Sequence, residues 1–446
     1  MPKKLFWLNL ICCVLANSAL AQDLPFGISL PPSLNFSTSP NPVGSGARAV
    51  GQGTAFIGVA DDATAASHNP AGLVQLQRPE ASIVGSYFYR REDQDVTASN
   101  TVVEDQTLDD ANLNYLSAVY PFQLFRRNMV VSLNYQRLVD LQGNSDVTSR
   151  FATIDGTQSV SSDQDGQLFT ISPALAVQIT PTLSLGAAFN IWPDIYDNGW
   201  DQDVSVNGKG RLASGNRIVP FVSTGKIKED YDFKGFNMTF GVLWDINQMF
   251  SLGGVFRTPF TAKVSHSHDS SLTVTLQDGS PPVTTSDSFS ENLDMDFPIS
   301  YGIGLAARLS DRLTLDLDVS RILWSDFKLE QSKRDTLMID NGAPSGKGRA
   351  VLNGEGDDTT SVRLGAEYLW IGPKFIIPAR AGVFYDPEPG DNGTDDFFGG
   401  SLGTGIAYKQ FLFDMAYEFR TGKIESEATD TTVYQHNVLA SMIFHF

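Results

Sequence analysis

The sequence predicts an all-β protein: a transmembrane antiparallel β-barrel of fourteen strands with an N-terminal plug (hatch) that contains short helices. Three observations predict this fold. Segments in which apolar and polar residues alternate recur throughout residues 81–446, the connections between them alternate between short and long, and the last segment, Val433–Phe446, ends on an aromatic residue. A barrel that spans an outer membrane needs such strands, because their two faces meet lipid and lumen.

Residues 1–21 have the pattern of a cleavable secretory signal peptide. A basic Lys3-Lys4 pair precedes an apolar stretch that ends at Leu15, and Ala21 completes a small-residue cleavage site. Both cysteines of the chain lie inside this segment. The exported chain is therefore expected to contain no disulfide, no cysteine-bound metal and no cysteine nucleophile.

Residues 22–80 are predicted to form the plug in the barrel lumen. They are rich in proline and small residues, they are too long for a simple leader, and their apolar side chains need a shelter that the lumen provides. A short helix is expected to stop at Asn69-Pro70, because the residue before a proline is biased away from helix. The pair could act as a movable latch or serve only as a helix stop, and the sequence leaves both readings open.

Residues 81–446 are predicted to form the barrel wall. Counting segments with a two-residue period gives fourteen. An even number of strands places both ends of the chain on the same side of the membrane. The segments are Ala81–Arg90, Leu113–Phe122, Asn128–Arg137, Gln167–Ile179, Thr182–Ile191, Asp232–Ile246, Met249–Val264, Phe289–Arg308, Arg312–Lys328, Thr360–Trp370, Lys374–Tyr385, Phe398–Lys409, Phe411–Arg420 and Val433–Phe446.

The connections between these segments alternate in length. Short turns alternate with longer polar connections, as at the periplasmic and extracellular ends of an outer-membrane barrel.

The formal net charge is −19, which excludes nucleic acid as a partner because no basic stripe is present to neutralise phosphates. Many of the acidic residues lie in the long connections. They are either solvated loop residues or ligands for divalent ions that bridge the loops to anionic lipid head groups.

Residue parity assigns the faces of the strands. In Phe411–Arg420 the odd positions are apolar and are expected to face lipid, whereas Asp414, Glu418 and Arg420 are expected to face the lumen. A charged side chain in the hydrocarbon would cost about 2–4 kcal/mol at the midplane if basic. Aromatic residues near strand ends are predicted to form interfacial girdles. They are Tyr120, Phe122, Trp192, Trp244, Trp324, Trp370 and Tyr408.

Four segments of the sequence resemble a known family. The tract from Gly44 to Leu73, which ends in Asn69-Pro70-Ala71-Gly72, is similar to the N-terminal signature of the FadL/TodX outer-membrane hydrocarbon transporters. The later segments Phe297–Phe327, Arg363–Tyr368 and Arg380–Pro387 also resemble that family. The similarity is spread over most of the exported chain.

The resemblance implies a fourteen-stranded barrel closed by an N-terminal hatch, through which long-chain fatty acids or other hydrophobic molecules diffuse passively. Asn69, Pro70, Ala71 and Gly72 would be the hatch motif. In the family the ligand leaves through a lateral opening made by a kink in the third strand. Here that strand, Asn128–Arg137, contains neither Gly nor Pro, so lateral and axial exits both stay open. A wider relative, the PorV-type group that serves protein secretion and cargo docking, supplies the alternative function.

Candidate ligand contacts follow from parity and from the long connections. Arg363, Arg380 and Arg420 are predicted to face the lumen together with Glu367, Asp414 and Glu418. Arg380, followed by Arg363, is the candidate partner for a ligand carboxylate, although these charges could instead pair with one another and brace the barrel. Phe221 and Leu141 are candidates for an outer apolar patch, or they only pack the loops together. Phe151, Ile154, Val219 and Val222 belong to the same prediction.

The sequence gives little support to catalysis. His266 and His268 could bind a metal only by recruiting Asp269 or Asp287, and no metalloprotease or phosphate-loop motif occurs. We therefore predict no enzymatic activity, no cofactor and no metal. The predicted protein is a monomer in the outer membrane whose partners are a hydrophobic small molecule and membrane lipid, including lipopolysaccharide. A general aqueous porin is disfavoured because the plug would obstruct ion flow.

Overall fold

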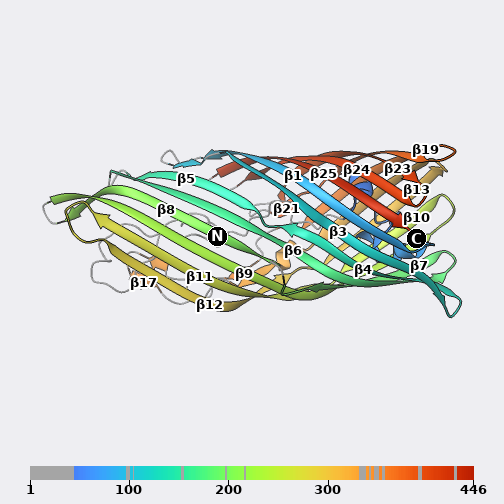
Figure 1. Cartoon of the computed structure of the whole chain (residues 1–446), viewed down its shortest axis with the longest axis horizontal. Helices are drawn as coiled ribbons and strands as arrows, with labels where there is room; N and C mark the ends of the chain where they lie inside the picture. Colours follow the sequence, from blue (N-terminus) through green and yellow to red (C-terminus); the bar gives the residue numbers. More distant parts are fainter. Residues whose placement is uncertain are drawn as a thin grey trace, which may run out of the picture.

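Fourteen strands form a closed antiparallel barrel in the part of the chain that the structure, a computed structural model, describes (Figure 1). The described residues are 45–96, 101–103, 105–151, 155–195, 198–214, 217–330, 338–340, 343–345, 351–353, 357–389, 394–425 and 429–446. The predicted signal peptide and residues 22–44 of the predicted plug lie outside them.

The order of the strands around the barrel follows the sequence, and β1 closes the ring by pairing with β25. Each predicted segment contains or overlaps one of these strands, so the predicted fold class is confirmed. The barrel strands are β1 (Glu80–Val96), β3 (Gln106–Leu124), β4 (Arg127–Asp140), β6 (Gly156–Thr180), β7 (Leu183–Trp192), β9 (Arg217–Asp245), β10 (Phe250–Arg257), β13 (Ser300–Ser310), β14 (Leu313–Ile322), β19 (Thr359–Ile371), β20 (Ile376–Tyr385), β23 (Phe397–Tyr408), β24 (Phe411–Glu425) and β25 (Thr429–His445).

The two faces of the strands differ as parity predicts. On β24, Phe413 and Met415 are 46% and 58% exposed on the outer surface, whereas Asp414 between them is 2% exposed and faces the lumen. The aromatic girdle is only partly as predicted. Trp192 and Trp324 are 7% and 6% exposed and lie inside, because they pack against other rings in the lumen rather than against lipid.

Two strands that the sequence analysis treats as continuous are broken. The predicted segment Met249–Val264 divides into β10 and β11 (Phe260–Leu276), and Phe289–Arg308 divides into β12 (Val283–Phe297) and β13. The breaks fall at Pro259 and Pro298, which have no backbone N–H to donate to a ladder. The two breaks face each other, because β10 pairs with β13 and β11 pairs with β12.

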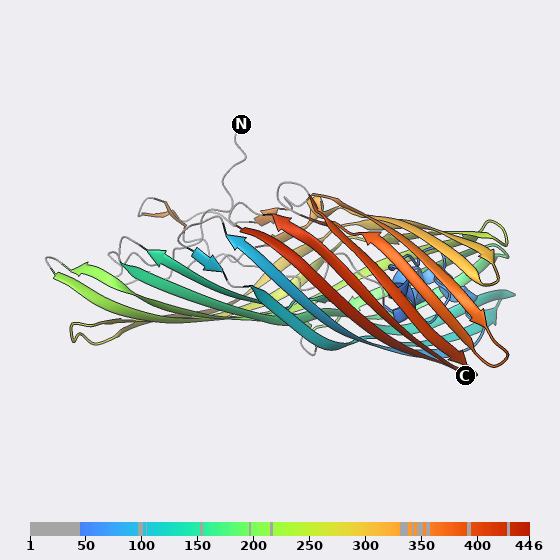
Figure 2. The same ribbon diagram turned by 90° about the horizontal axis from the view of Figure 1, so that it is seen from above.

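The long connections are mostly strands rather than polar loops, which corrects the sequence-based expectation. At the end of the barrel where the long connections lie, β6 and β9 continue beyond the ring and pair with neighbouring strands in a projecting sheet (Figures 1 and 2). We call it the extracellular sheet, after the side that the sequence predicts for these connections. Its other strands are β2 (Thr101–Val103), β5 (Gly143–Phe151), β8 (Gly199–Ser214), β11, β12, β15 (Lys328–Glu330) and β18 (Val351–Asn353). Two small hairpins, β16 (Met338–Asp340) with β17 (Ala343–Ser345) and β21 (Glu388–Pro389) with β22 (Thr394–Asp395), are separate.

The inside of the barrel holds a hatch, which we define as residues 45–79. It contains α1 (Ala47–Gly51), α2 (Ala65–His68) and the 3-10 helix η2 (Pro70–Gln75), all in contact with the barrel wall (Figure 2). Within the described ranges, no helix is long and apolar enough to cross a membrane.

The hatch touches the wall at glycines. A Cβ on Gly241 of β9 would lie 2.1 Å from the Asn69 side chain, and one on Gly253 of β10 would lie 2.1 Å from the Ile57 carbonyl. The missing side chains therefore allow the hatch backbone to lie directly against the strands.

Candidate functional site: the hatch and the lumenal pockets

Asn69 joins the hatch to the wall. Its Nδ2 donates to the carbonyls of Ile57 at 2.9 Å and of Val242 in β9 at 3.0 Å, and its Oδ1 accepts from the N–H of Ala71 at 3.1 Å. The side chain is fully buried. The following Pro70 begins η2, so the helix α2 does stop at Asn69 as expected. Pro70, Ala71 and Gly72 are buried in that turn.

Arg380 lies between two carboxylates. Its Nε donates to Glu367 at 2.6 Å and its Nη1 donates to Asp414 at 2.5 Å. Glu367 also binds Arg48 of the hatch, at 3.0 and 3.1 Å. The guanidinium of Arg380 is thus committed to a network that connects three barrel strands to the hatch, which is the bracing arrangement that the sequence analysis left open.

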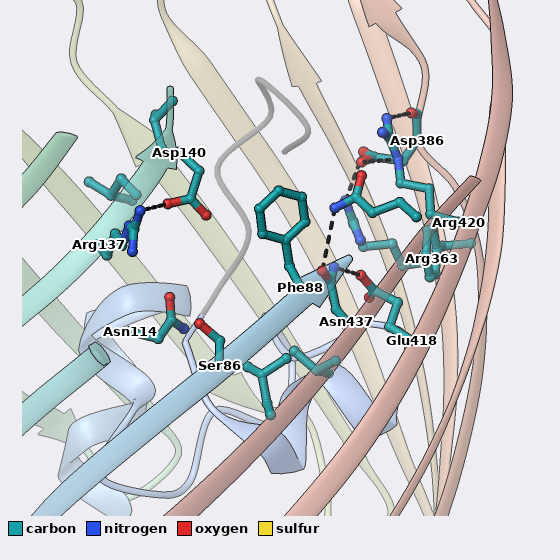
Figure 3. Close-up of a pocket in the computed structure, with 16 residues that line it drawn as sticks. Ser86, Phe88, Asn114, Arg137, Asp140, Arg363, Asp386, Glu418, Arg420 and Asn437 are labelled. Atoms are coloured by element: carbon teal, nitrogen blue, oxygen red, sulfur yellow. Dashed lines mark hydrogen bonds and ion pairs between the residues drawn. The ribbon is translucent and has the colours of Figure 1, made fainter. Parts of the chain in front are cut away.

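Arg363 and Arg420 share Asp386 in a second network. Arg363 contacts the Asp386 carboxylate at 2.7 Å, and Arg420 contacts the Asp386 carbonyl at 3.1 Å and Glu388 at 2.7 Å. Arg363, Asp386 and Arg420 line a pocket of about 740 Å3, part of it open to solvent, which we call the polar chamber (Figure 3). Its other lining residues include Ser86, Phe88, Asn114, Arg137, Asp140, Glu418 and Asn437.

A second lumenal pocket, of about 750 Å3 including space open to solvent, is lined largely by apolar and aromatic side chains. Trp192 stacks on Phe260 with ring centroids 5.6 Å apart, and Phe260 stacks on Phe297 at 4.8 Å. We call this the apolar pocket. Its lining comprises Ala66, Ser67, Gln136, Leu138, Val139, Asn190, Trp192, Asn237, Thr239, Arg257, Thr258, Phe260, Phe297, Pro298, Ser300, Ile322 and Trp324.

The apolar pocket contains one arginine, Arg257 at the end of β10. Its Nη2 donates to the carbonyl of Ser67 at 3.2 Å, and among the described residues no carboxylate forms an ion pair with it. The nearest histidine of the hatch does not add a charge. Burial, together with the charge of Arg257, lowers the pKa of His68 to about 3, so that His68 is neutral near pH 7.

The two pockets share Leu138 and Val139 of β4 as lining residues, so they meet at these side chains. The backbone of β4 is irregular at this point, because its register with β6 shifts between Arg137 and Val139. The irregularity begins where the predicted third strand ends. It is a bulge in a sequence without Gly or Pro, which explains why the sequence analysis did not find it.

The barrel wall is incomplete beside the polar chamber. The ladder between β3 and β4 ends at the pair Tyr115–Gln136. Beyond this pair, toward the long connections, β3 pairs only with β1 and β4 only with β6, so the two strands do not pair with each other. Among the described residues this stretch is bridged by side chains. Asp110 of β3 accepts from Gln142 at 2.8 Å and lies 3.4 Å from Arg137. We call this interval the seam.

The remaining predicted residues that the structure describes lie in or next to the extracellular sheet. Leu141 is fully buried in an apolar cluster with Trp192 and Phe233, and Phe221 is 1% exposed near the far end of β9. The structure does not bring these two together. Val222 faces the opposite side of the sheet and is 42% exposed, and Ile154 lies outside the described residues.

The two histidines have carboxylate neighbours other than those predicted. His266 contacts Glu229 at 2.7 Å and Glu291 at 3.3 Å, and His268 contacts Glu229 at 2.6 Å. Asp269 is exposed on the other face. Where the structure describes the chain, no three His, Cys, Asp or Glu residues are grouped so as to hold a metal ion.

A closed barrel with an internal hatch and apolar lumenal space is the architecture of an outer-membrane transport protein. The family described as outer membrane protein transport protein (OMPP1/FadL/TodX) matches residues 43–398, and the chain belongs to it. The family consists of outer-membrane β-barrel transporters of hydrophobic compounds, so this chain is an outer-membrane transporter of that class rather than a member of an enzyme family.

Solved structures share the fold. A FadL homologue of Pseudomonas aeruginosa has a TM-score of 0.59 at 14% identity, over 92% of this chain and 99% of that one. The toluene transporter TodX of P. putida has a TM-score of 0.55 at 15% identity, over 91% and 99%. The monoaromatic hydrocarbon channel CymD has a TM-score of 0.53 at 17% identity, over 91% and 98%. A comparison with curated proteins finds no match.

Proposed function

We propose that this protein takes up hydrophobic molecules that carry a carboxylate, such as long-chain fatty acids, by passive passage through the barrel. The observation that carries the proposal is Arg257, an arginine without a described carboxylate partner in a pocket of stacked aromatic rings. Arg363 and Arg380, the candidates from the sequence, are already bound by carboxylates of the protein.

The apolar pocket suits both parts of such a ligand. Trp192, Phe260 and Phe297 offer ring faces to a hydrocarbon tail, and burial of apolar surface stabilises by about 25 cal/mol per Å2. The guanidinium of Arg257 can form two parallel hydrogen bonds to a carboxylate. A charge in a partly desolvated site is costly without a partner, and a bound carboxylate would supply that partner.

The polar chamber and the seam supply a lateral exit. A ligand that passes Leu138 and Val139 reaches the polar chamber, and the chamber is lined by Asn114 and Arg137, the residues immediately above the last β3–β4 pair. Outer-face residues of β3 below the seam include the exposed Leu116, so the opening lies beside the lipid-facing band. Below the seam each barrel strand is paired on both sides and β1 closes the ring with β25, which supports a monomer in contact with membrane lipid and lipopolysaccharide.

Ligand binding tests the role of Arg257. Arg257→Met should weaken binding of a long-chain fatty acid roughly ten- to hundred-fold, because a hydrogen bond to a charged group contributes about 1.5–3 kcal/mol. Binding of the alcohol with the same chain length should hardly change. The control is Arg321→Gln, which removes an outward-facing arginine that is 42% exposed. Equal losses for acid and alcohol, or no loss for the acid, would refute the proposal.

Cross-linking tests the exit. A bifunctional reagent joining cysteines in Asp110→Cys/Gln142→Cys would close the seam, and uptake of labelled fatty acid by cells should fall and return after cleavage of the linker. The control is Gln123→Cys/Asn128→Cys, a pair in the intact part of the same β3–β4 ladder. Unchanged uptake with the seam closed would favour axial exit through the hatch.

A further inference from the structure

The periplasmic rim of the barrel is basic although the chain is strongly acidic. The net charge is −19, yet the turns and strand ends at this rim carry a group of exposed cations that we call the basic rim. It consists of Arg78, Arg126, Arg127, Arg312, Lys374 and Lys409. The acidic residues at the same end include the exposed Asp311, Asp245, which accepts a hydrogen bond from Ser251 at 2.7 Å, and the buried Glu80, which contacts His445 at 3.0 Å.

The cations of the basic rim are not neutralised by the protein. Within the described residues, none of the six forms a salt bridge, whereas most arginines of the lumen do. Lys409 lies over the ring of Tyr408 at 5.2 Å, which leaves its charge in place. An uncompensated band of one sign attracts a surface of the opposite sign and repels one of its own.

The basic rim lies beside the lower aromatic girdle. Trp244, Trp370, Phe375 and Tyr408 are 43–53% exposed and lie at or next to the ends of strands. Aromatic residues in such positions mark the boundary between hydrocarbon and head groups. Cations one to a few residues beyond that boundary are level with phospholipid head groups of the periplasmic leaflet.

The turn between β3 and β4 has two bulky residues in a backbone conformation that is unfavourable for them. Phe125 and Arg126 have φ of 51° and 58°, the left-handed values that a two-residue hairpin turn needs and that Asn-Gly adopts most easily. Lys409, in another turn of this rim, has φ of 56°. A left-handed non-glycine residue costs on the order of 1–2 kcal/mol. Phe125 is also 87% exposed, so internal packing does not explain why the bulky residues are there.

We propose that the basic rim binds the phosphate head groups of anionic phospholipids in the periplasmic leaflet, with Phe125 inserted among the acyl chains. Juxtamembrane Lys and Arg residues gain attraction from an anionic leaflet, and the gain falls with ionic strength. This interaction is independent of the transported ligand. It holds the barrel at a fixed depth in the bilayer and leaves the acidic extracellular sheet outside.

The test uses the full-length exported protein in vesicles that contain either brominated phosphatidylglycerol or brominated phosphatidylcholine. Trp244 and Trp370 face lipid at this rim and are quenched by bromine, whereas Trp192, Trp200 and Trp324 are at most 7% exposed. The ratio of quenching in the two lipids reports the preference for the anionic head group. We expect a preference of several-fold at low salt that decreases toward one at high salt.

Two variants with the same loss of charge separate the rim from the rest of the surface. The rim variant is Arg126→Gly, Arg127→Gln and Lys374→Gln, and its preference should fall close to one. The control is Lys209→Gln, Lys226→Gln and Lys228→Gln in the extracellular sheet, and its preference should stay at the wild-type value.

Folding is checked in neutral detergent. Arg126→Gly relieves the strained φ, so the melting temperature of the rim variant should not fall. A wild-type ratio of one at low salt overturns the proposal and would favour an acidic periplasmic protein as the occupant. A rim variant that keeps the wild-type preference overturns it as well.

Discussion

The attachment of the hatch through Asn69 can be tested by removing its side chain. Asn69→Ala deletes the hydrogen bonds to Ile57, Val242 and Ala71 and leaves two carbonyls and one N–H without these partners. A hydrogen bond contributes about 0.5–1.5 kcal/mol net, and the site is fully buried, so the loss should be about 2–4 kcal/mol. At about 1.4 kcal/mol per factor of ten, the population of undocked hatch should rise roughly 30- to 1000-fold.

The readout is ion conductance in planar bilayers, together with proteolysis of the hatch in purified protein. The wild-type protein should conduct poorly because the hatch fills the lumen, and Asn69→Ala should show frequent openings and faster cleavage. The matched control is Gln75→Ala, another hatch residue, whose side chain donates one hydrogen bond to Val59 at 3.0 Å. Gln75→Ala should change the population of undocked hatch by tenfold or less. Equal conductance and cleavage in Asn69→Ala and the wild type would show that the residue is only a helix stop.

The other predictions concern the charges and the close packing of the lumen. Arg380→Ala should lower the stability of the detergent-solubilised protein by about 3–5 kcal/mol because Glu367 and Asp414 lose a buried partner, whereas Arg257→Met should leave the melting temperature unchanged or raised. Because the pKa of His68 is lowered from 6.5 to about 3, His68 stabilises the folded state fully above pH 6.5. This stabilisation is lost as the pH falls toward 3, by up to about 1.4 kcal/mol per pH unit. His68→Gln should therefore flatten the dependence of hatch proteolysis on pH. Gly186→Val should displace the hatch and raise conductance, because a Cβ at this position would lie 2.3 Å from Pro70.

The faces of the strands are decided locally, and the sequence could therefore predict them. Neighbouring side chains on a strand point to opposite sides, so the alternation in Phe411–Arg420 was enough to place Asp414 inside and Met415 outside. The short turns could likewise be located from the sequence, because a tight turn depends only on a few adjacent residues. The helix stop at Asn69 followed from the next residue, Pro70.

The partners of the inward charges depend on register between strands that are distant in sequence. Parity alone also points Arg257 inward, and its neighbours in the ladders are Ser300 and Thr239, whereas Arg380 stands opposite Glu367. This difference decides which arginine remains open to a ligand. It could have been found from the sequence only with the pairing register in hand.

The alternation of residues determined the barrel and its two surfaces, because each strand carries that information in its own sequence. Only the tertiary structure decided that the breaks at Pro259 and Pro298 face each other and that the ladder between β3 and β4 stops at Tyr115. It also decided that Pro298 and Asn114 line two pockets that share Leu138. These features depend on how separate strands pair, and the energy of a cross-strand contact depends on both strands and their register rather than on the sequence of either one.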